Sequence, residues 1–396
     1  MSKTIRPIII AGAGPVGMTA AADLVRAGIA VTVLEKSEFL SQESRASTFH
    51  PPTLDMLDDL GFARELIQQG LKAPQVQYGS SLDGELGTFD FSEIADLTRH
   101  PYRLQAEQFK LTRIIYEALK DNPLFDIRFS TEVAALRQDS RGVSVTTQHG
   151  QTLECEWLIG ADGANSVVRR HQNIGFEGFT WPERFLVVTT SADIASLRPG
   201  VTSVSYWADP KRWHFLLRII GAWRVMLPVP AEISDEEGRS KEYAQASLAS
   251  VLPPGMSAPI EHVTLYRVHQ RVASNFRSGR TFLAGDAAHI NNPLGGMGMN
   301  GGLHDALNLT ARLRAVILEG QPEELLDGYD RQRRAVTVEA IQVGTIHNKK
   351  NLEARTDADR QAFNEEIRDA ISNREAARKF LRRISMIDSL ERAAAL

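Results

Sequence analysis

The sequence predicts a mixed α/β (α+β) protein, in which a parallel-sheet domain is combined with an antiparallel-sheet domain and a helical C-terminus. Three observations indicate this fold class. Residues 8–35 have the pattern strand, glycine turn, helix, strand. Residues 176–272 contain alternating, aromatic-rich strands, which are typical of a sheet with one covered face. After Gly302 the pattern is helical to the last residue.

The first strand and helix are expected at the centre of the parallel sheet. Ile8-Ile9-Ile10-Ala11 is a short continuous apolar run, which is typical of a strand buried on both faces. The alanine-rich segment from Gly14 to Ala27 predicts a helix that ends before Gly28. Residues 30–34 predict a second buried strand, and Glu35 stands at its end.

The turn between the first strand and the helix matches the dinucleotide fingerprint. Gly12 permits a tight turn, Gly14 lets a pyrophosphate approach the main chain, and Gly17 lets helix and strand pack closely. The carboxylate of Glu35, at the end of the following strand, can bind both ribose hydroxyls. These features predict a Rossmann-like domain with the following candidate binding residues: Gly12, Ala13, Gly14, Pro15, Val16, Gly17, Glu35 and Lys36.

The remaining elements divide the chain into alternating parts. A helix with one buried face is expected at residues 107–120, and strands are expected at 125–129, 133–137, 143–147, 153–159 and 281–284. A helical insert at 235–251 interrupts the middle strands. The expected parts are 1–72, 104–175 and 273–345 for the nucleotide-binding domain, 73–103 and 176–272 for the substrate domain, and 346–396 for the C-terminal helices.

Composition excludes several classes of protein. The formal net charge is -4 and the Lys and Arg residues are dispersed, so we expect neither nucleic acid nor a membrane surface as a partner. One cysteine, Cys155, excludes an internal disulfide, and its apolar strand indicates an inert core position. We expect a cytoplasmic protein, because no signal peptide and no uninterrupted apolar run of about 18 residues is present. Metal-ligand spacing and a nucleophile-elbow motif are also absent from the sequence.

A second glycine-rich segment needs another explanation. Gly296 to Gly301 also fits the dinucleotide pattern, with Glu319 at the spacing that Glu35 has from the first motif, but a loop containing Pro293 precedes it and Glu319 ends a helix. The segment follows the buried strand 281–284, where Asp286 can accept a hydrogen bond from a polyol chain. A glycine-rich loop that opens a helix places amides and a positive dipole end beside a group that becomes anionic, as a reduced flavin does.

Three segments together resemble the class A flavoprotein monooxygenases, the p-hydroxybenzoate hydroxylase-like group. Gly285–Asn300 resembles the second FAD motif of that group, and Gly160–Arg169 its Asp-Gly motif. Arg45-Ala46-Ser47 resembles the Arg-bearing segment after the second strand, and Gln108 the glutamine that begins the next helix. The similarity runs in order over roughly residues 5 to 350, with the phenol and 3-hydroxyphenylpropionate hydroxylase branch most similar. Asn292 and Met297 depart from that branch, which often has proline and glutamine there.

The resemblance implies an FAD-dependent monooxygenase that consumes NADH or NADPH as a transient co-substrate and hydroxylates a phenolic or N-heteroaromatic small molecule through a flavin C4a-hydroperoxide. It implies that Gly12–Gly17 bind the pyrophosphate and Glu35 the adenosine ribose, and that Pro293 shapes the pocket beside the ring. The other implied FAD contacts are Arg45 and Gln108 at the phosphate and ribityl region, Val133 at the adenine, Asp162 in the Asp-Gly motif, Asp286 at the ribityl chain, and the amides near Gly298, Met299 and Asn300.

The substrate residues are less constrained by the sequence. The polar and aromatic candidates on the middle strands are Tyr206, Trp207, His214, Trp223, Arg224 and Tyr266. Strand alternation lets some of these face a pocket, and either His214 or Tyr206 is a candidate to deprotonate a phenol. His289, inside the flavin loop, is expected to make a structural hydrogen bond instead.

Three alternatives share the same motifs. The first keeps FAD and changes the reaction to epoxidation, a Baeyer–Villiger reaction or inactivation of an antibiotic. The second is a flavin-binding redox sensor without enzymatic activity. The third, a flavin halogenase, is disfavoured because its tryptophan-rich motif after the first helix is absent. A monomer and a homodimer are both compatible with the sequence.

Overall fold

The computed structural model describes residues 8–43 and 46–396, and a six-stranded, mainly parallel sheet organises one half of the molecule. All residues of β1 and β2 are buried, as expected for strands covered on both faces. From one edge to the other, the strands are β18 (Arg277–Ser278), β19 (Thr281–Leu283), β12 (Leu158–Gly160), β1 (Ile8–Ala11), β2 (Val31–Leu34) and β8 (Phe125–Arg128).

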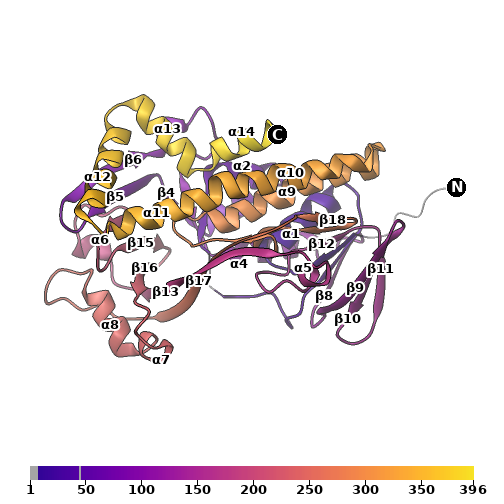
Figure 1. Cartoon of the computed structure of the whole chain (residues 1–396), viewed down its shortest axis with the longest axis horizontal. Coiled ribbons are helices and arrows are strands. Elements are labelled where there is room, and N and C mark those ends of the chain that lie inside the picture. Colours follow the sequence, from indigo (N-terminus) through magenta and orange to yellow (C-terminus); the bar gives the residue numbers. More distant parts are fainter. Residues whose placement is uncertain (1–7, 44–45) are drawn as a thin grey trace.

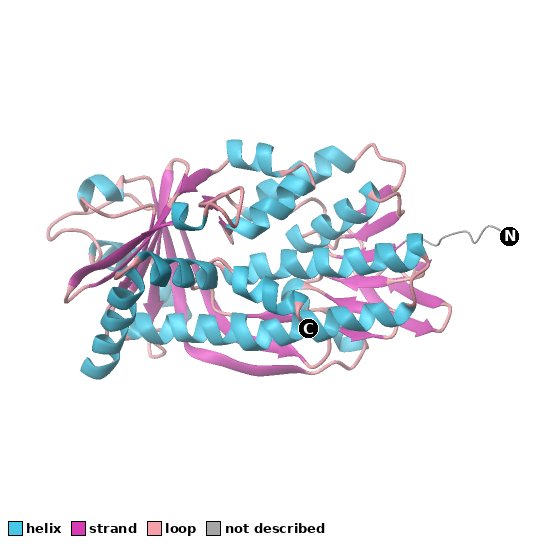
Figure 2. Cartoon of the chain, turned by 90° about the horizontal axis from the view of Figure 1, so that it is seen from above, coloured by secondary structure: helices cyan, strands magenta, loops and turns pink. Residues whose placement is uncertain are grey.

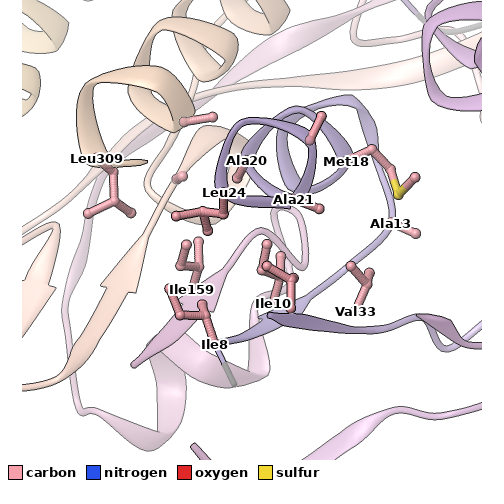
Figure 3. Close-up of a cluster of buried hydrophobic side chains, with 14 of the residues drawn as sticks. Ile8, Ile10, Ala13, Met18, Ala20, Ala21, Leu24, Val33, Ile159 and Leu309 are labelled. Carbon is pink, nitrogen blue, oxygen red and sulfur yellow. The ribbon is translucent and has the colours of Figure 1, made fainter. Parts of the chain in front are cut away.

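Helices that are far apart in the sequence share one core with this sheet. α1 (Pro15–Arg26) and α9 (Met297–Glu319) bury apolar side chains together with β1. Figure 3 shows Leu24 of α1 above Ile8, with Leu309 of α9 beside them. α4 (Gln108–Leu119) buries Leu111, Ile114 and Ile115, which confirms the predicted helix with one buried face.

Two small sheets flank the parallel sheet. One contains β3 (Thr48–Phe49), β7 (Arg103–Gln105) and β4 (Leu71–Ala73), and the other contains β11 (Thr152–Cys155), β10 (Gly142–Thr147) and β9 (Val133–Asp139). The short helices near them are α2 (Pro51–Asp59), α3 (Ala63–Gln68) and α5 (Val167–His171).

The single strand predicted at residues 153–159 is wrong. The chain leaves β11 after Cys155 and enters β12, in a different sheet, at Leu158. Trp157, which is fully buried, lies at the crossing. Residues 153–159 look like one strand in the sequence because buried residues lie on both sides of the crossing, although the two parts belong to different sheets.

The middle region forms an eight-stranded sheet, to which a hairpin from residues 75–90 is added. The hairpin joins through a parallel pairing of β5 with β14, whereas the other neighbours are antiparallel. The strands lie in the order β20 (His289–Ile290), β17 (His262–Ala273), β13 (Phe176–Thr190), β16 (Ala222–Val229), β15 (His214–Ile219), β14 (Val204–Ala208), β5 (Gln75–Ser80) and β6 (Gly84–Asp90).

Each face of this sheet has its own core. Alternate residues such as Tyr206 and Phe215 pack against α12 (Asp357–Ile371) and α13 (Arg374–Ile384). The residues between them, such as Leu216, pack on the opposite face with α8. On that face lie α6 (Ile194–Leu197), α7 (Asp235–Gly238) and α8 (Lys241–Ala249), so the insert predicted at 235–251 is two helices. The side chain of Ser240 caps the second helix by accepting from the Tyr243 amide.

One long helical rod connects the two halves of the molecule (Figure 1). It consists of α10 (Asp327–Val336), a π-helical segment (Thr337–Gln342) and α11 (Val343–Glu353), without a break. α14 (Ile387–Ala394) then returns to pack on α10. Figure 2 shows the eight-stranded sheet at one end of the molecule and further strands near the other. The limit expected at residue 345 falls inside this rod.

The described residues confirm the predicted α/β class with a helical C-terminus. Within 8–43 and 46–396, no helix combines the length and the apolar character that crossing a bilayer requires.

Candidate functional site

The first glycine turn assigns a different task to each of its three glycines. A Cβ on Gly12 would lie 2.4 Å from the Ala161 carbonyl oxygen, and φ there is +103°. A Cβ on Gly17 would lie 2.0 Å from the carbonyl oxygen of Gly12, so helix and strand are in direct contact. A Cβ on Gly14 would meet nothing within 4 Å, which leaves open space at the start of α1. α1 also begins without a side-chain cap, so its first amides are available to an anion.

The Glu35 carboxylate is fixed beside this turn. One oxygen accepts the Ala13 amide at 2.8 Å and the other accepts the Ser37 amide at 2.9 Å. The side chain is half-buried, and each carboxylate oxygen keeps a second lone pair for a ligand hydroxyl. Lys36, the next residue, is exposed.

The second glycine-rich segment lies directly against the first. Val16 in the first turn of α1 packs on Gly285 and on Gly302 of α9, where an added Cβ would lie 2.8 Å and 2.7 Å from a Val16 methyl. Arg314 of α9 and Asp23 of α1 form an ion pair at 2.9 Å further along the same contact. Two motifs that are far apart in the sequence therefore form one continuous surface.

The N-terminus of α9 presents main-chain amides. Gly296 precedes the helix in the left-handed region, with φ +69°, and no side chain caps the first turn that contains Gly298 and Met299. The Asn300 side chain does not reach outward: it accepts the His50 amide and donates to the carbonyls of Thr48 and Gly296. Asn300 thus fastens α9 to β3.

The aspartates of the two later motifs have different surroundings. Asp286 is exposed in the 3-10 turn Gly285–Ala287, whereas both of its neighbours are buried. Asp162 accepts the amides of Val167 and Val168 and so caps α5. Arg169 donates to the carbonyls of Ala164 and Ala287. These bonds link the Asp-Gly segment to the 3-10 turn.

An open hollow of about 490 Å³ lies where β9 meets α5. Its lining residues are Glu132, Val133, Ala134, Val167, Arg170 and His171, so it contains Val133, the residue expected beside an adenine. Gln108 is the first residue of α4, and its main-chain amide donates to the Ala46 carbonyl. Arg45 lies outside the described residues.

A fully buried group of charged and polar side chains lies beneath the glycine-rich segment at residues 285–300. Asp305 of α9 contacts Nε2 of His289 at 2.8 Å and accepts from Nε of Arg333 at 2.7 Å. Burial by itself raises the pKa of Asp305, but His289 and Arg333 more than offset this and lower it to about 2. His289 therefore makes a structural contact, as expected.

The loop that carries Pro293 is also held from below. The Asn292 side chain donates to the side-chain Oε1 of Gln270 and to the main-chain carbonyl of Thr345. It also accepts from the Leu294 main-chain amide. Gln270 donates in turn to Thr345 Oγ1. Asn292, which stands where the phenol hydroxylase branch often has proline, thus has a hydrogen-bond partner for each polar atom of its side chain.

Tyr206 and His214 lie on opposite faces of the eight-stranded sheet. Tyr206 faces the core that contains α12 and α13, stacks on Phe215, and borders an enclosed cavity of about 20 Å³, which is room for one water at most. His214 faces away and accepts from Nη1 of Arg198 at 2.9 Å. Burial, followed by the Arg198 charge, lowers the pKa of His214 to about 3. We therefore leave His214 out of the proposed site.

Three buried groups of this region were missed by sequence reasoning. His50 donates from Nε2 to the Gly295 carbonyl, Asp305 holds Arg333, and Arg103 reaches toward Tyr206. Each lies in a segment that looks like ordinary helix or strand in the sequence. A polar residue inside an apolar pattern was the available signal for Arg103, between Tyr102 and Leu104.

The arrangement fits FAD on structural grounds. Gly14 leaves space for a pyrophosphate, Glu35 is held ready for a ribose, and two helices with uncapped N-termini are in contact through Val16. A metal site is not offered: the residues of the described ranges contain no cluster of three or more His, Cys, Asp or Glu side chains suited to hold an ion.

Comparisons with known proteins give the same picture. Residues 6–343 match the family described as FAD binding domain. The para-nitrophenol 4-monooxygenase of Pseudomonas sp. (strain WBC-3) is 33% identical over 388 residues, 96% of this chain and 95% of that protein. The 6-hydroxy-3-succinoylpyridine 3-monooxygenase of Pseudomonas putida is 35% identical over 87% of this chain and 88% of its own length. The crystal structure of a p-nitrophenol 4-monooxygenase from Pseudomonas putida superposes with a TM-score of 0.91 and 31% identity, covering 98% of both chains.

Proposed function

This chain belongs to the FAD binding domain family and is an FAD-dependent, NAD(P)H-consuming aromatic monooxygenase, and from that premise we propose which residues serve the flavin and the substrate. We propose further that the substrate is a six-membered aromatic ring that carries a hydroxyl group, either a phenol or a hydroxypyridine. The names of the two relatives, for a nitrophenol and a hydroxypyridine, support this class.

The nucleotide end of the flavin is bound by main chain more than by side chains. Gly12 to Gly17 and the first amides of α1 hold the pyrophosphate, and Glu35 accepts from the ribose hydroxyls. Val133 borders the adenine in the hollow between β9 and α5. Asp286, at the edge of the 3-10 turn, takes the ribityl chain. Arg45, Lys36, Gln108 and Asp162 stay as proposed contacts or supports around this path.

The ring end is bound by the N-terminus of α9. The amides of Gly298, Met299 and Asn300, together with the helix dipole, stabilise negative charge on a group placed there. His50, Asn300 and the Asn292–Gln270–Thr345 network hold this loop rigid, so that the amides need no reorganisation when charge develops. Pro293 stands on the same loop and shapes the wall beside the ring.

FAD supplies the transfer of electrons from NAD(P)H to O2 and the activated oxygen. The chain supplies position and exclusion of water, since Asn292, Leu294 and Met297 around the Pro293 loop are buried. Tyr206 is the candidate to accept or hold the proton of the substrate hydroxyl, since it shares a buried cluster with Leu294 of the Pro293 loop and its hydroxyl lies 3.4 Å from Nη1 of Arg103.

The contact of Val16 with Gly285 and Gly302 carries this proposal, because it places both motifs on one surface. The experiment measures flavin reduction without oxygen, by NADH and by NADPH, with and without 4-nitrophenol or 2-hydroxypyridine. Acceleration by one ring class, followed in air by a product one oxygen atom heavier, is expected. Equal rates with every phenol and hydroxypyridine, or an epoxide or lactone as product, would contradict the proposal.

A further inference from the structure

Arg103 on β7 is a buried cation without a carboxylate. Its side chain is 1% exposed, and within the described ranges no Asp or Glu oxygen lies within 4 Å of it. Its two hydrogen bonds are long, 3.4 Å to the Tyr206 hydroxyl and 3.2 Å to the Ile384 carbonyl. Its Nε has no partner at all among the described residues. A buried guanidinium that is neither paired nor fully bonded is unfavourable unless a ligand completes it.

The other buried arginines show how unusual this is. Arg333 has Asp305 at 2.7 Å, and Arg184 pairs with Asp235. Arg169 has no carboxylate at bonding distance, but it donates to two carbonyls at 2.8 Å and 2.7 Å and covers the Phe176 ring. Each of these has a bond of 2.8 Å or shorter within the fold, although Arg333 also keeps a buried Nη1 without a partner among the described residues. Both bonds of Arg103 are 3.2 Å or longer.

The position of Arg103 is at the ring end of the proposed flavin site. His50, which bonds to Gly295 in the flavin loop, is close enough for the Arg103 charge to lower its pKa, second only to burial. Gln105 lies two residues along β7 and therefore on the same face. Its Oε1 accepts from Thr48, but its buried Nε2 has no partner among the described residues. Two buried donors on one strand face thus point to an acceptor that the chain itself does not provide.

The neighbouring carboxylate is already engaged. Glu366, which borders the cavity beside Tyr206, is bound by His347, Asn351 and Arg383 at 2.7 to 2.8 Å. His50 is not an alternative counter-ion, because its ring is neutral or positive. No carboxylate of the described residues is therefore placed to neutralise Arg103.

We infer that Arg103 selects the substrate by charge, by binding a negatively charged oxygen group on the aromatic ring. This inference rests on the proposed function, since it assigns the polar end of that substrate. A guanidinium gives a planar fork of donors that matches a carboxylate or a phenolate flanked by another oxygen. The enzyme accordingly prefers ionised aromatic substrates over neutral ones of the same shape.

The test compares two ligands of the same shape, 4-hydroxybenzoate and its neutral amide, 4-hydroxybenzamide. The dissociation constant of each is measured from the change in flavin absorbance of the holoenzyme. We expect the anion to bind on the order of tenfold to a hundredfold more tightly. Arg103→Met removes this preference and leaves the affinity for the amide unchanged. Arg103→Lys, which keeps the charge but not the fork, retains part of it.

Arg113→Met, on the exposed side of α4, is the matched control and leaves both affinities unchanged. FAD content and melting temperature are measured for each variant. Equal affinities for the two ligands in the wild-type enzyme, or an undiminished preference in Arg103→Met, would overturn the inference. If the Met variant does not fold, the wild-type preference and its reduction in Arg103→Lys decide the question. Failure of the proposed function looks different, since then neither ligand accelerates flavin reduction.

Discussion

The nucleotide part and the substrate part of the proposed site are built on different principles. At the α1 end, the ligand-facing groups belong to the main chain, and the glycines are distinguished by what a Cβ would meet. At the sheet end, the proposed contacts are side chains, and their use depends on which face of β14 or β15 they occupy. A site made of main chain is tolerant of neighbouring side chains but intolerant of any added atom. A site made of side chains tolerates small changes and is lost by a single change of face.

The largest effects are expected in the first turn of α1. Gly14→Val adds a side chain to open space at ordinary backbone angles, so we expect a folded protein that has lost FAD. Gly17→Val places a branched side chain against the Gly12 carbonyl, so we expect loss of stability of roughly 3 kcal/mol or more. Circular dichroism, urea unfolding and flavin absorbance of the purified variants separate the two.

The Gly14→Val and Gly17→Val variants can each contradict the role given to the main chain in this turn. A yellow Gly14→Val protein with full FAD would show that the pyrophosphate lies elsewhere. A stable Gly17→Val protein would show that helix and strand are not in the close contact described.

Asp305→Asn tests the support beneath the second motif and has the next largest effect. The substitution keeps the shape of the side chain but leaves Arg333 buried without its counter-ion, so we expect a loss of about 3–5 kcal/mol. Urea unfolding at neutral pH measures it. A loss below about 1 kcal/mol would mean that this ion pair does not hold α9 in place.

The same carboxylate gives a pH dependence. The folded pKa of Asp305, about 2, is lower than the ordinary value of about 3.9 in an unfolded chain. Its contribution to stability is therefore complete above about pH 4 and is lost as the pH falls toward about 2. Stability curves of the wild type and of Asp305→Asn should converge over that window, and parallel curves would contradict the assignment.

The smallest effects separate the two faces of the eight-stranded sheet. Tyr206→Phe removes the hydroxyl near Arg103, and we expect kcat to fall by on the order of a hundredfold with FAD retained. His214→Gln removes ring contacts with Arg198, the Arg212 carbonyl and Trp207, all on the face away from Tyr206, and we expect kcat to be unchanged with a loss of about 1 kcal/mol of stability. Steady-state NAD(P)H consumption and product yield are the measurements. The reverse result would exchange the roles of the two faces.

The same division explains what the sequence could and could not predict. β1, α1, β2 and the role of each glycine follow from local rules, because backbone geometry limits which residue fits. His214 and Tyr206 are both polar residues on strands, and only the pairing of β14 with β15 decides which one faces α12. The crossing at Trp157 and the partners of Asn292 depend on segments that lie elsewhere in the sequence. Long-range pairing leaves no trace in a local pattern.

The π-helical segment within the long rod sets the rotation of everything that follows it. A π turn holds about one residue more than an α turn, so the segment takes up one residue that would otherwise turn α11 by about 100° about its axis. Thr345 would then swing away from Gln270, and Asn348 from the Leu294 carbonyl. By taking up this residue, the π segment keeps Thr345 and Asn348, which bond to the loop that carries Pro293, in the correct rotation relative to α10, which bears Arg333.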